Sequence, residues 1–231
     1  MLEVRGLTGG WGPTIVVQDV SFTLARNETL AIVGRNGVGK STLLELITGR
    51  ARHRAGEILK DGGDIARVRL HGRARLGIGH VPQQREVFAS LTVDEHLTIA
   101  RRPGAWDREK VLALFPSLAA RRRSLGAQLS GGEQQMLAIA RALVGNPDVL
   151  LMDEPSEGLA PVVIEQLVQA LRRLTADRTL SILLVEQRID IARQLADRFL
   201  AMDRGAIVHS GSARELEATG ELAGLLGLAQ A

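Results

Sequence analysis

The chain has 231 residues, a formal net charge of +3 and no cysteine. This length exceeds that of most single domains but falls short of two, so we expect one α/β domain with an inserted lobe. The lack of cysteine excludes disulfides, thiolate zinc sites and cysteine nucleophiles. No apolar run approaches the ~20 residues that a bilayer crossing requires, and the first residues lack an apolar secretory core. A cytoplasmic protein is expected, and any membrane role requires a partner.

Nucleic-acid binding is not expected. Aromatic residues make up 3% of the chain, which leaves little surface on which bases could stack. Basic residues alternate with acidic ones instead of forming a stripe.

The first part of the chain predicts short strands, then a turn and a helix. Strand-like pieces occupy residues 2–7, 14–17 and 21–24. Residues 29–33 are an apolar run that ends in glycine, as a buried strand does where it enters a turn. Residues 41–48 then have helical spacing.

The middle of the chain changes to helical character. Thr92 and Glu95 resemble a capping box at the start of one helix. Asp107 begins a second helical stretch, and Pro116 ends it. The predicted division of the single domain, residues 1–231, is an α/β core of residues 1–85 and 145–231 with a helical lobe of residues 86–144.

After this lobe the pattern alternates between helices and strands. The predicted elements are a helix at 130–144, a strand at 149–152, a helix at 162–174, a strand at 180–185, a further helix, and two short strands at 199–202 and 206–209. Such alternation is typical of a mainly parallel sheet with helices on both faces.

A phosphate-binding loop is the first functional motif. The octapeptide Gly34-Arg35-Asn36-Gly37-Val38-Gly39-Lys40-Ser41 fits the phosphate-loop pattern and lies between an apolar strand and a helix. Its backbone N–H groups and the positive end of the helix suit phosphate oxygens. We expect Lys40 to neutralise the β and γ phosphates, Ser41 to ligate Mg²⁺, and Thr42 to complete the nucleotide-binding run. A chance glycine-rich turn is the alternative, which the Gly-Lys-Ser ending disfavours.

Two carboxylates follow the apolar strand at 149–152. Asp153 and Glu154 are expected at its C-terminal end, where open parallel sheets bind ligands. We expect Asp153 to serve the Mg²⁺ ion and Glu154 to polarise the water that attacks the γ-phosphate. A carboxylate in that place can act as a general base or orient the water. The alternative is that Asp153 caps the turn that follows through Pro155.

Two further residues are candidates for the nucleotide site. Trp11 lies ahead of Gly12 in the N-terminal strands, and its ring could stack on adenine or simply be a core or surface aromatic. Gln83 follows a strand-like stretch at 76–81, and its amide oxygen could reach Mg²⁺ or the attacking water. An exposed loop glutamine is the alternative for Gln83.

A second glycine pair predicts a second anion site. Ser130-Gly131-Gly132-Glu133 opens an unbroken helix, so its hydroxyl and backbone N–H groups lie at a helix N-terminus. An ordinary N-cap with flexible glycines is the alternative. One chain can hardly direct both glycine loops at one γ-phosphate, whereas two chains packed head to tail can.

Together these motifs resemble those of the ATP-binding-cassette (ABC) ATPases. The phosphate loop, Gln83, the Ser130-Gly131-Gly132 run, the Asp153-Glu154 pair and the region near Gln187 occur in the expected order over nearly the whole chain. The resemblance implies a phosphate-loop NTPase of the α/β class, with a mainly parallel core sheet, an N-terminal antiparallel β subdomain and an inserted helical subdomain. It also implies hydrolysis of ATP with Mg²⁺. The implied catalytic residues are Lys40, Glu154 and Gln187.

Some stretches are similar to one subfamily, the smaller ATPase subunit of branched-chain amino acid importers. These are Gly34-Arg35-Asn36-Gly37, residues 81–93, Asp153-Glu154-Pro155-Ser156-Glu157-Gly158-Leu159-Ala160-Pro161 and Leu184-Val185-Glu186-Gln187. The resemblance implies a peripheral subunit on the cytoplasmic face of a bacterial inner membrane. Its implied partners are a second ATPase, identical or not, two transmembrane permeases and, indirectly, a periplasmic binding protein.

The chain also departs from the family pattern. Most cassette ATPases have a histidine γ-phosphate sensor where this chain has Gln187, although the branched-chain subfamily often has glutamine there. Arg188 replaces the asparagine that commonly follows. Val38, Gln83 and residues 189–204 are similar instead to ATPases of urea importers. Branched-chain amino acids are the expected solutes, with urea or a short amide as the alternative.

The resemblance implies that ATP closes a sandwich of two ATPases and that hydrolysis reopens it. Closure would move residues near Val87, Phe88 and Leu91 against a permease helix, although these apolar residues fit a lobe core equally well. A soluble cassette ATPase in DNA repair, translation or cofactor assembly is a further alternative, disfavoured because heptads, a fused second cassette and a nucleic-acid surface are absent from the sequence. A phosphate-loop kinase or GTPase would leave the Ser130 loop without a purpose.

Overall fold

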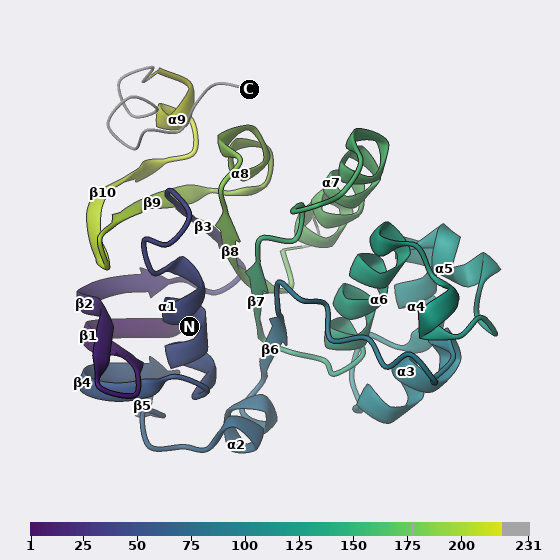
Figure 1. Ribbon diagram of the computed structural model, residues 1–231, viewed down its shortest axis with the longest axis horizontal. Coiled ribbons are helices and arrows are strands. Elements are labelled where there is room, and N and C mark those ends of the chain that lie inside the picture. Colours follow the sequence, from purple (N-terminus) through teal and green to yellow (C-terminus); the bar gives the residue numbers. More distant parts are fainter. Residues whose placement is uncertain (177, 219–231) are drawn as a thin grey trace.

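A six-stranded, mainly parallel sheet forms the centre of the protein (Figure 1). The computed structural model describes residues 1–176 and 178–218. The strand order is β10-β9-β3-β8-β7-β6, in which only the β10–β9 pair is antiparallel. The strands are β3 (Thr29–Val33), β6 (Ile78–Val81), β7 (Val149–Asp153), β8 (Ser181–Glu186), β9 (Arg198–Asp203) and β10 (Ala206–Ser212). Every residue of β3, β7 and β8 is buried, as expected for parallel strands covered on both faces.

A four-stranded antiparallel sheet precedes and flanks this core. Its strands, in the order β2-β1-β4-β5, are β1 (Leu2–Trp11), β2 (Thr14–Leu24), β4 (Arg52–Lys60) and β5 (Gly63–Asp64). The two pieces expected at 14–17 and 21–24 are therefore one strand, which continues through Asp19 with a positive φ of 49°. The sequence pattern missed β4 because only its last three residues, Ile58, Leu59 and Lys60, are buried.

Helices cover both faces of the parallel sheet. They are α1 (Lys40–Thr48), α2 (Leu70–Arg75), α3 (Val93–Ala100), α4 (Arg108–Leu114), α5 (Pro116–Ala120), α6 (Gly131–Leu143), α7 (Pro161–Ala176), α8 (Ile189–Leu195) and α9 (Glu215–Ala218). Figure 1 shows α3 to α6 grouped on one side of β7, away from α1 and the antiparallel sheet. The predicted division into core and lobe remains a prediction, and its last part, residues 219–231, lies outside the described residues.

Local sequence signals set the ends of the lobe helices. The Thr92 hydroxyl accepts from the Glu95 N–H while the Glu95 carboxylate accepts from the Thr92 N–H, which confirms the predicted capping box. Asp107 caps α4 by accepting from the Lys110 N–H at 2.8 Å. Pro116 follows the end of α4 as expected, but it also occupies the first turn of α5 because a first-turn residue needs no N–H partner.

The central strands divide their side chains between two apolar cores. Val149 and Leu151 pack in the core that contains α1 and the antiparallel sheet. Leu150 and Met152 pack in the other core, with α6 and α7. This alternation along β7 follows from the two-residue period of a strand, and it fixes the strand between the phosphate-loop helix and the lobe.

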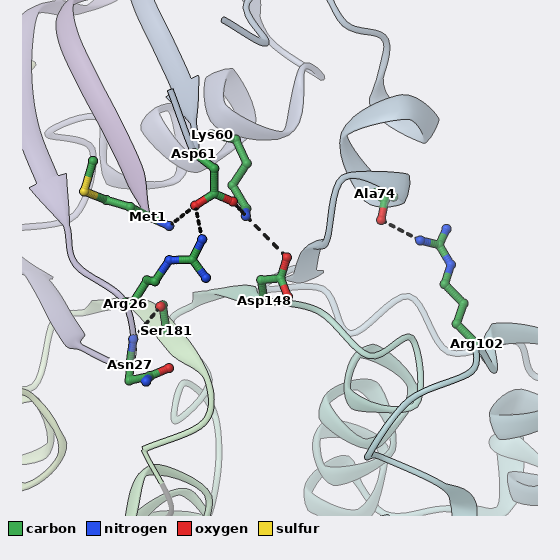
Figure 2. A network of polar contacts seen from close by, with 9 residues as sticks. All are labelled: Met1, Arg26, Asn27, Lys60, Asp61, Ala74, Arg102, Asp148 and Ser181. Atoms are coloured by element: carbon green, nitrogen blue, oxygen red, sulfur yellow. Dashed lines mark hydrogen bonds and ion pairs between the residues drawn. The ribbon is translucent and has the colours of Figure 1, made fainter. Parts of the chain in front are cut away.

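A polar network joins the two sheets where the parallel strands begin (Figure 2). Lys60, at the end of β4, donates to the Asp61 carboxylate and, at 3.3 Å, to Asp148, which directly precedes β7. The Asn27 N–H donates to the Ser181 hydroxyl at the start of β8, at 2.8 Å. These contacts tie the antiparallel sheet to the end of the core that is opposite the C-terminal ends of the parallel strands.

A buried guanidinium holds the C-terminal end of α1. Arg73, on α2, is 3% exposed and donates to the carbonyls of Leu46 and Ile47 at 2.7 and 2.8 Å. It also donates to the carbonyls of Val68 and Ala66, at 2.8 and 2.7 Å. The last carbonyls of a helix have no partner within the helix, so this one side chain satisfies two of them and connects α1 to α2.

We expect Arg73→Leu to lower the free energy of unfolding by about 3 kcal/mol, because it leaves buried carbonyls without donors. Urea denaturation measures the change. Arg75→Leu, an exposed arginine on the same helix, is the matched control and should alter stability by less than about 0.5 kcal/mol. Equal effects of the two substitutions would contradict the role given to Arg73.

Candidate active site

The loop between β3 and α1 has the form that the phosphate-loop motif predicts. Gly34 follows β3 so closely against β9 that a Cβ atom there would lie 2.4 Å from the Met202 carbonyl oxygen. Gly39 caps α1 with a φ of 110°, in the region that favours glycine. The two glycines therefore let the backbone turn directly from a buried strand into a helix. The N-terminus of this helix faces the C-terminal ends of the parallel strands.

Lys40 is buried under this loop and points toward the acidic pair. Its Nζ donates to the carbonyls of Gly34 and Arg35 at 2.9 and 3.0 Å, and it forms an ion pair with Glu154 Oε1 at 3.0 Å. The side chains of Lys40 and Glu154 are 3% and 7% exposed. Because both charges are removed from water, each depends on the other and on its hydrogen bonds.

Ser41 and Asp153 meet beside this ion pair. The Ser41 hydroxyl donates to Asp153 Oδ1 at 3.0 Å. Burial raises the pKa of Asp153 to about 6, against the opposing hydrogen bond from Ser41. The two oxygen donors suit Mg²⁺, which protein sites hold through one or two carboxylates together with substrate phosphates. Within the described residues no group of three or more histidine, aspartate or glutamate side chains could hold a metal by itself.

Glu154 adopts an uncommon backbone conformation just after β7. Its φ is +44°, and its N–H donates to the Val185 carbonyl of β8 at 2.9 Å. Asp153 pairs with the same Val185 in the parallel register. Neighbouring strand ends therefore hold Glu154 in a conformation that a non-glycine residue seldom adopts, with its carboxylate directed at Lys40.

Three other candidate residues, Trp11, Gln83 and Gln187, lie in segments near the C-terminal ends of the parallel strands or beside the first turn of α1. The Trp11 indole N–H donates to the Thr42 hydroxyl at 3.3 Å, so the half-exposed ring lies beside the first turn of α1. The Gln83 amide donates to the carboxylate of Glu157, in the loop after Glu154. Gln187 is exposed and directly follows β8, which lies between β3 and β7.

The second glycine run lies elsewhere in the chain. Ser130 is the N-cap of α6, and its hydroxyl accepts from the Glu133 N–H at 3.3 Å while Glu133 accepts from the Ser130 N–H at 2.8 Å. A Cβ atom on Gly132 would lie 2.4 Å from Val163 of α7. Since α1 and α6 lie on opposite sides of β7 (Figure 1), the Ser130 run does not join the group around Lys40 within one chain.

Two arginines that the motifs did not indicate hold the segment after Gln83. Arg50, just beyond α1, forms two hydrogen bonds with the Glu86 carboxylate, at 2.8 and 3.1 Å. Arg141 of α6 donates to the backbone carbonyls of Glu86 and Arg85, at 2.5 and 3.1 Å. No local pattern reveals these contacts because the partners are far apart in the sequence. They connect the residues that directly follow α1 to α6.

The chain is similar to known proteins over most of its length. The family model described as ABC transporter matches residues 17–157. A probable branched-chain amino acid transport ATP-binding protein, LivF of Archaeoglobus fulgidus, is 39% identical and the match covers 94% of both chains. The high-affinity branched-chain amino acid transport ATP-binding protein BraG of Pseudomonas aeruginosa is 37% identical over 90% of this chain and 91% of its own.

Another relative belongs to an export system. The lipopolysaccharide export system ATP-binding protein LptB of Haemophilus influenzae is 32% identical over 94% of this chain and 92% of its own. Among solved structures, an ATP-binding subunit of an ABC transporter superposes with a TM-score of 0.82 at 28% identity, covering 98% of this chain and 99% of that one. A cassette in a dimeric post-hydrolysis state bound to ADP and Pi gives 0.80 at 26% identity, covering 93% and 99%.

In the described part of the chain, no helix has both the length and the apolar character needed to span a membrane. The family match, the identity to transport ATP-binding proteins over nearly the whole chain and the shared fold agree with the site formed by Lys40, Ser41, Asp153 and Glu154. The chain is an ATP-binding subunit of the ABC transporter family.

Proposed function

We propose that this chain hydrolyses ATP with Mg²⁺ to drive a bacterial importer of branched-chain amino acids. The observation that carries the catalytic part is the convergence of Lys40 and Ser41 on Glu154 and Asp153 at distances of 3.0 Å. The similarity to LivF and BraG supports the solute class. A second ATPase, two permeases and a periplasmic binding protein would complete the system, with this subunit on the cytoplasmic face of the inner membrane.

In the proposed reaction the phosphate loop and the N-terminus of α1 bind the triphosphate, and Lys40 neutralises its β and γ groups. Ser41 and Asp153, with Gln83 as a further candidate, would hold Mg²⁺, which supplies positive charge to the β and γ oxygens. Glu154 then directs water at the γ-phosphate. Trp11 would stack on the adenine.

The proposed catalytic unit contains two ATPase chains. Ser130, Gly131 and Gly132 lie at the N-terminus of α6, which offers N–H donors to an anion, and Glu133 holds that terminus in shape. In a head-to-tail pair these residues would contact the ATP held by the partner's phosphate loop. The similarity to a dimeric cassette bound to ADP and Pi supports this arrangement. Gln187 would contact the γ-phosphate from the end of β8.

The proposed permease contact lies beside the Gln83 loop. Phe88 is 52% exposed, whereas Val87 packs partly against the apolar core. The Phe88 ring stacks on His96 with centroids 5.7 Å apart, and the Arg141 guanidinium lies 5.7 Å from its centroid. Phe88 is therefore an ordered apolar surface on a segment attached to both α1 and α6, which suits a site that transmits movement to a membrane partner.

We expect Glu154→Gln to lower kcat for ATP hydrolysis by about 100-fold or more, because the amide cannot accept a proton from water. ATP binding should persist, and ATP should trap the closed dimer, which size-exclusion chromatography would detect. Glu165→Gln, an exposed change on α7, is the control and should leave turnover unchanged. Normal turnover in the Glu154 variant would overturn the proposed catalytic role.

Phe88→Ala should weaken association with the permeases by about tenfold or more, as expected when an aromatic side chain that becomes buried in the complex is removed. Co-purification of the membrane complex measures the effect, and ATP binding by the isolated subunit verifies its folding. Ile99→Ala, which removes another exposed apolar side chain (61% exposed) from α3, should leave the complex intact. If both variants assemble normally, the contact lies elsewhere.

The solute class can be tested in the reconstituted transporter. Leucine with the cognate binding protein should stimulate ATP turnover, while urea should not. Stimulation by urea alone would replace branched-chain amino acids with the alternative solute and leave the ATPase assignment in place.

A further inference from the structure

A buried glutamate that takes no part in the proposed chemistry lies next to the active site. Glu186 is the last residue of β8 and is 1% exposed. It pairs with Val33, the residue before the phosphate loop, while the preceding Val185 pairs with Asp153. The Glu186 backbone therefore lies at the strand end between the phosphate loop and the Asp153-Glu154 pair.

The Glu186 carboxylate holds two loops at once. It accepts a hydrogen bond from the Ser156 N–H at 3.3 Å and another from the Ser156 hydroxyl at 3.0 Å. The backbone N–H of Arg188 also favours the charged form of this carboxylate and so acts to lower its pKa. Ser156 is two residues after Glu154, and Arg188 is the residue after Gln187, so one side chain fixes the backbone beside both.

Burying the Glu186 carboxylate costs free energy, which its hydrogen bonds must offset. Burial raises the pKa of Glu186 to about 7, although the hydrogen bonds from Ser156 and Arg188 act in the opposite direction. A carboxylate removed from water stabilises a fold only through the groups it bonds. For Glu186 those groups are chiefly the Ser156 N–H and hydroxyl. The residue therefore contributes by fixing the position of the backbone near Glu154.

The turn that carries Glu154 is held at both ends by the end of β8. The Glu154 N–H donates to the Val185 carbonyl at 2.9 Å, and Ser156 binds the Glu186 carboxylate. Only Pro155 lies between these fixed points. The positive φ of Glu154, 44°, is thus maintained by two neighbouring residues of one strand.

We propose that Glu186 is a positioning residue for ATP hydrolysis, which sets Glu154 and Gln187 relative to each other through the Ser156 side chain and the Arg188 N–H. This inference rests on the proposed role of Glu154 in directing water. Small displacements of a reacting group can reduce turnover by about 100-fold without affecting substrate binding. The expected signature is therefore a loss in kcat at nearly constant KM.

Three variants of the full chain test whether turnover depends on the hydrogen bonds that Glu186 makes or on its negative charge. Glu186→Ala removes all the contacts and should lower kcat by about 10- to 100-fold, with KM for ATP within about threefold. Glu186→Gln keeps an acceptor for the Ser156 N–H and can donate to its hydroxyl, so kcat should remain within about threefold of the parent. Ser156→Ala removes one of the two Ser156 contacts and should give an intermediate loss. Glu165→Gln, an exposed change on α7, is the control and should have no effect.

The double variant Glu186→Ala with Ser156→Ala provides the decisive comparison. If the two residues act through one contact, the double variant should be no slower than Glu186→Ala alone. Effects that multiply, an unchanged kcat in Glu186→Ala, or a Glu186→Gln variant as slow as Glu186→Ala would each overturn the proposal. Should Glu186→Ala fail to fold, the Gln and Ser156 variants still decide it by their kcat and thermal unfolding temperatures.

Failure of this inference differs from failure of the proposed function. An active Glu154→Gln variant would remove the reaction on which the inference rests. An inactive Glu154→Gln variant together with a fully active Glu186→Ala variant would refute only the positioning role.

Discussion

The buried ion pair between Lys40 and Glu154 is the contact on which the arrangement of the active site depends. It joins the first residue of α1 to the residue after β7, and β8 lies between their two strands. Two charges so removed from water are tolerated only where the surrounding backbone supplies fixed partners. The fully buried strands β3, β8 and β7 provide that rigid frame, and the cores on their two faces keep the strand ends in register.

The helical part is attached to this frame by polar contacts as well as by packing. Arg50 extends from the end of α1 to Glu86, and Arg141 extends from α6 to the carbonyls of the same segment. Arg85 and Glu86 both have positive φ values, 62° and 48°. These are conformations that non-glycine residues seldom adopt, and the contacts of Arg50 and Arg141 hold the backbone there, next to Gln83 and Phe88.

Sequence reasoning succeeded where the signal is local. The phosphate loop, the strand before Asp153 and the Thr92 capping box each depend on neighbouring residues, and each is present in the structure. It missed β4 because charged, exposed residues obscure the period of that strand. It also missed Arg73 and Glu186, whose partners are brought close only by folding. The roles of Trp11, Gln83 and Gln187 remain predictions.

Arg73 also has an electrostatic consequence for α1. The peptide dipoles of a helix sum to partial charges of about half a unit at each end, positive at the N-terminus. Arg73 neutralises the negative end of α1 from within the protein, where dissolved ions screen a charge much less than at the surface. The helix therefore presents a net positive field at its phosphate-facing end, with Lys40 beside it.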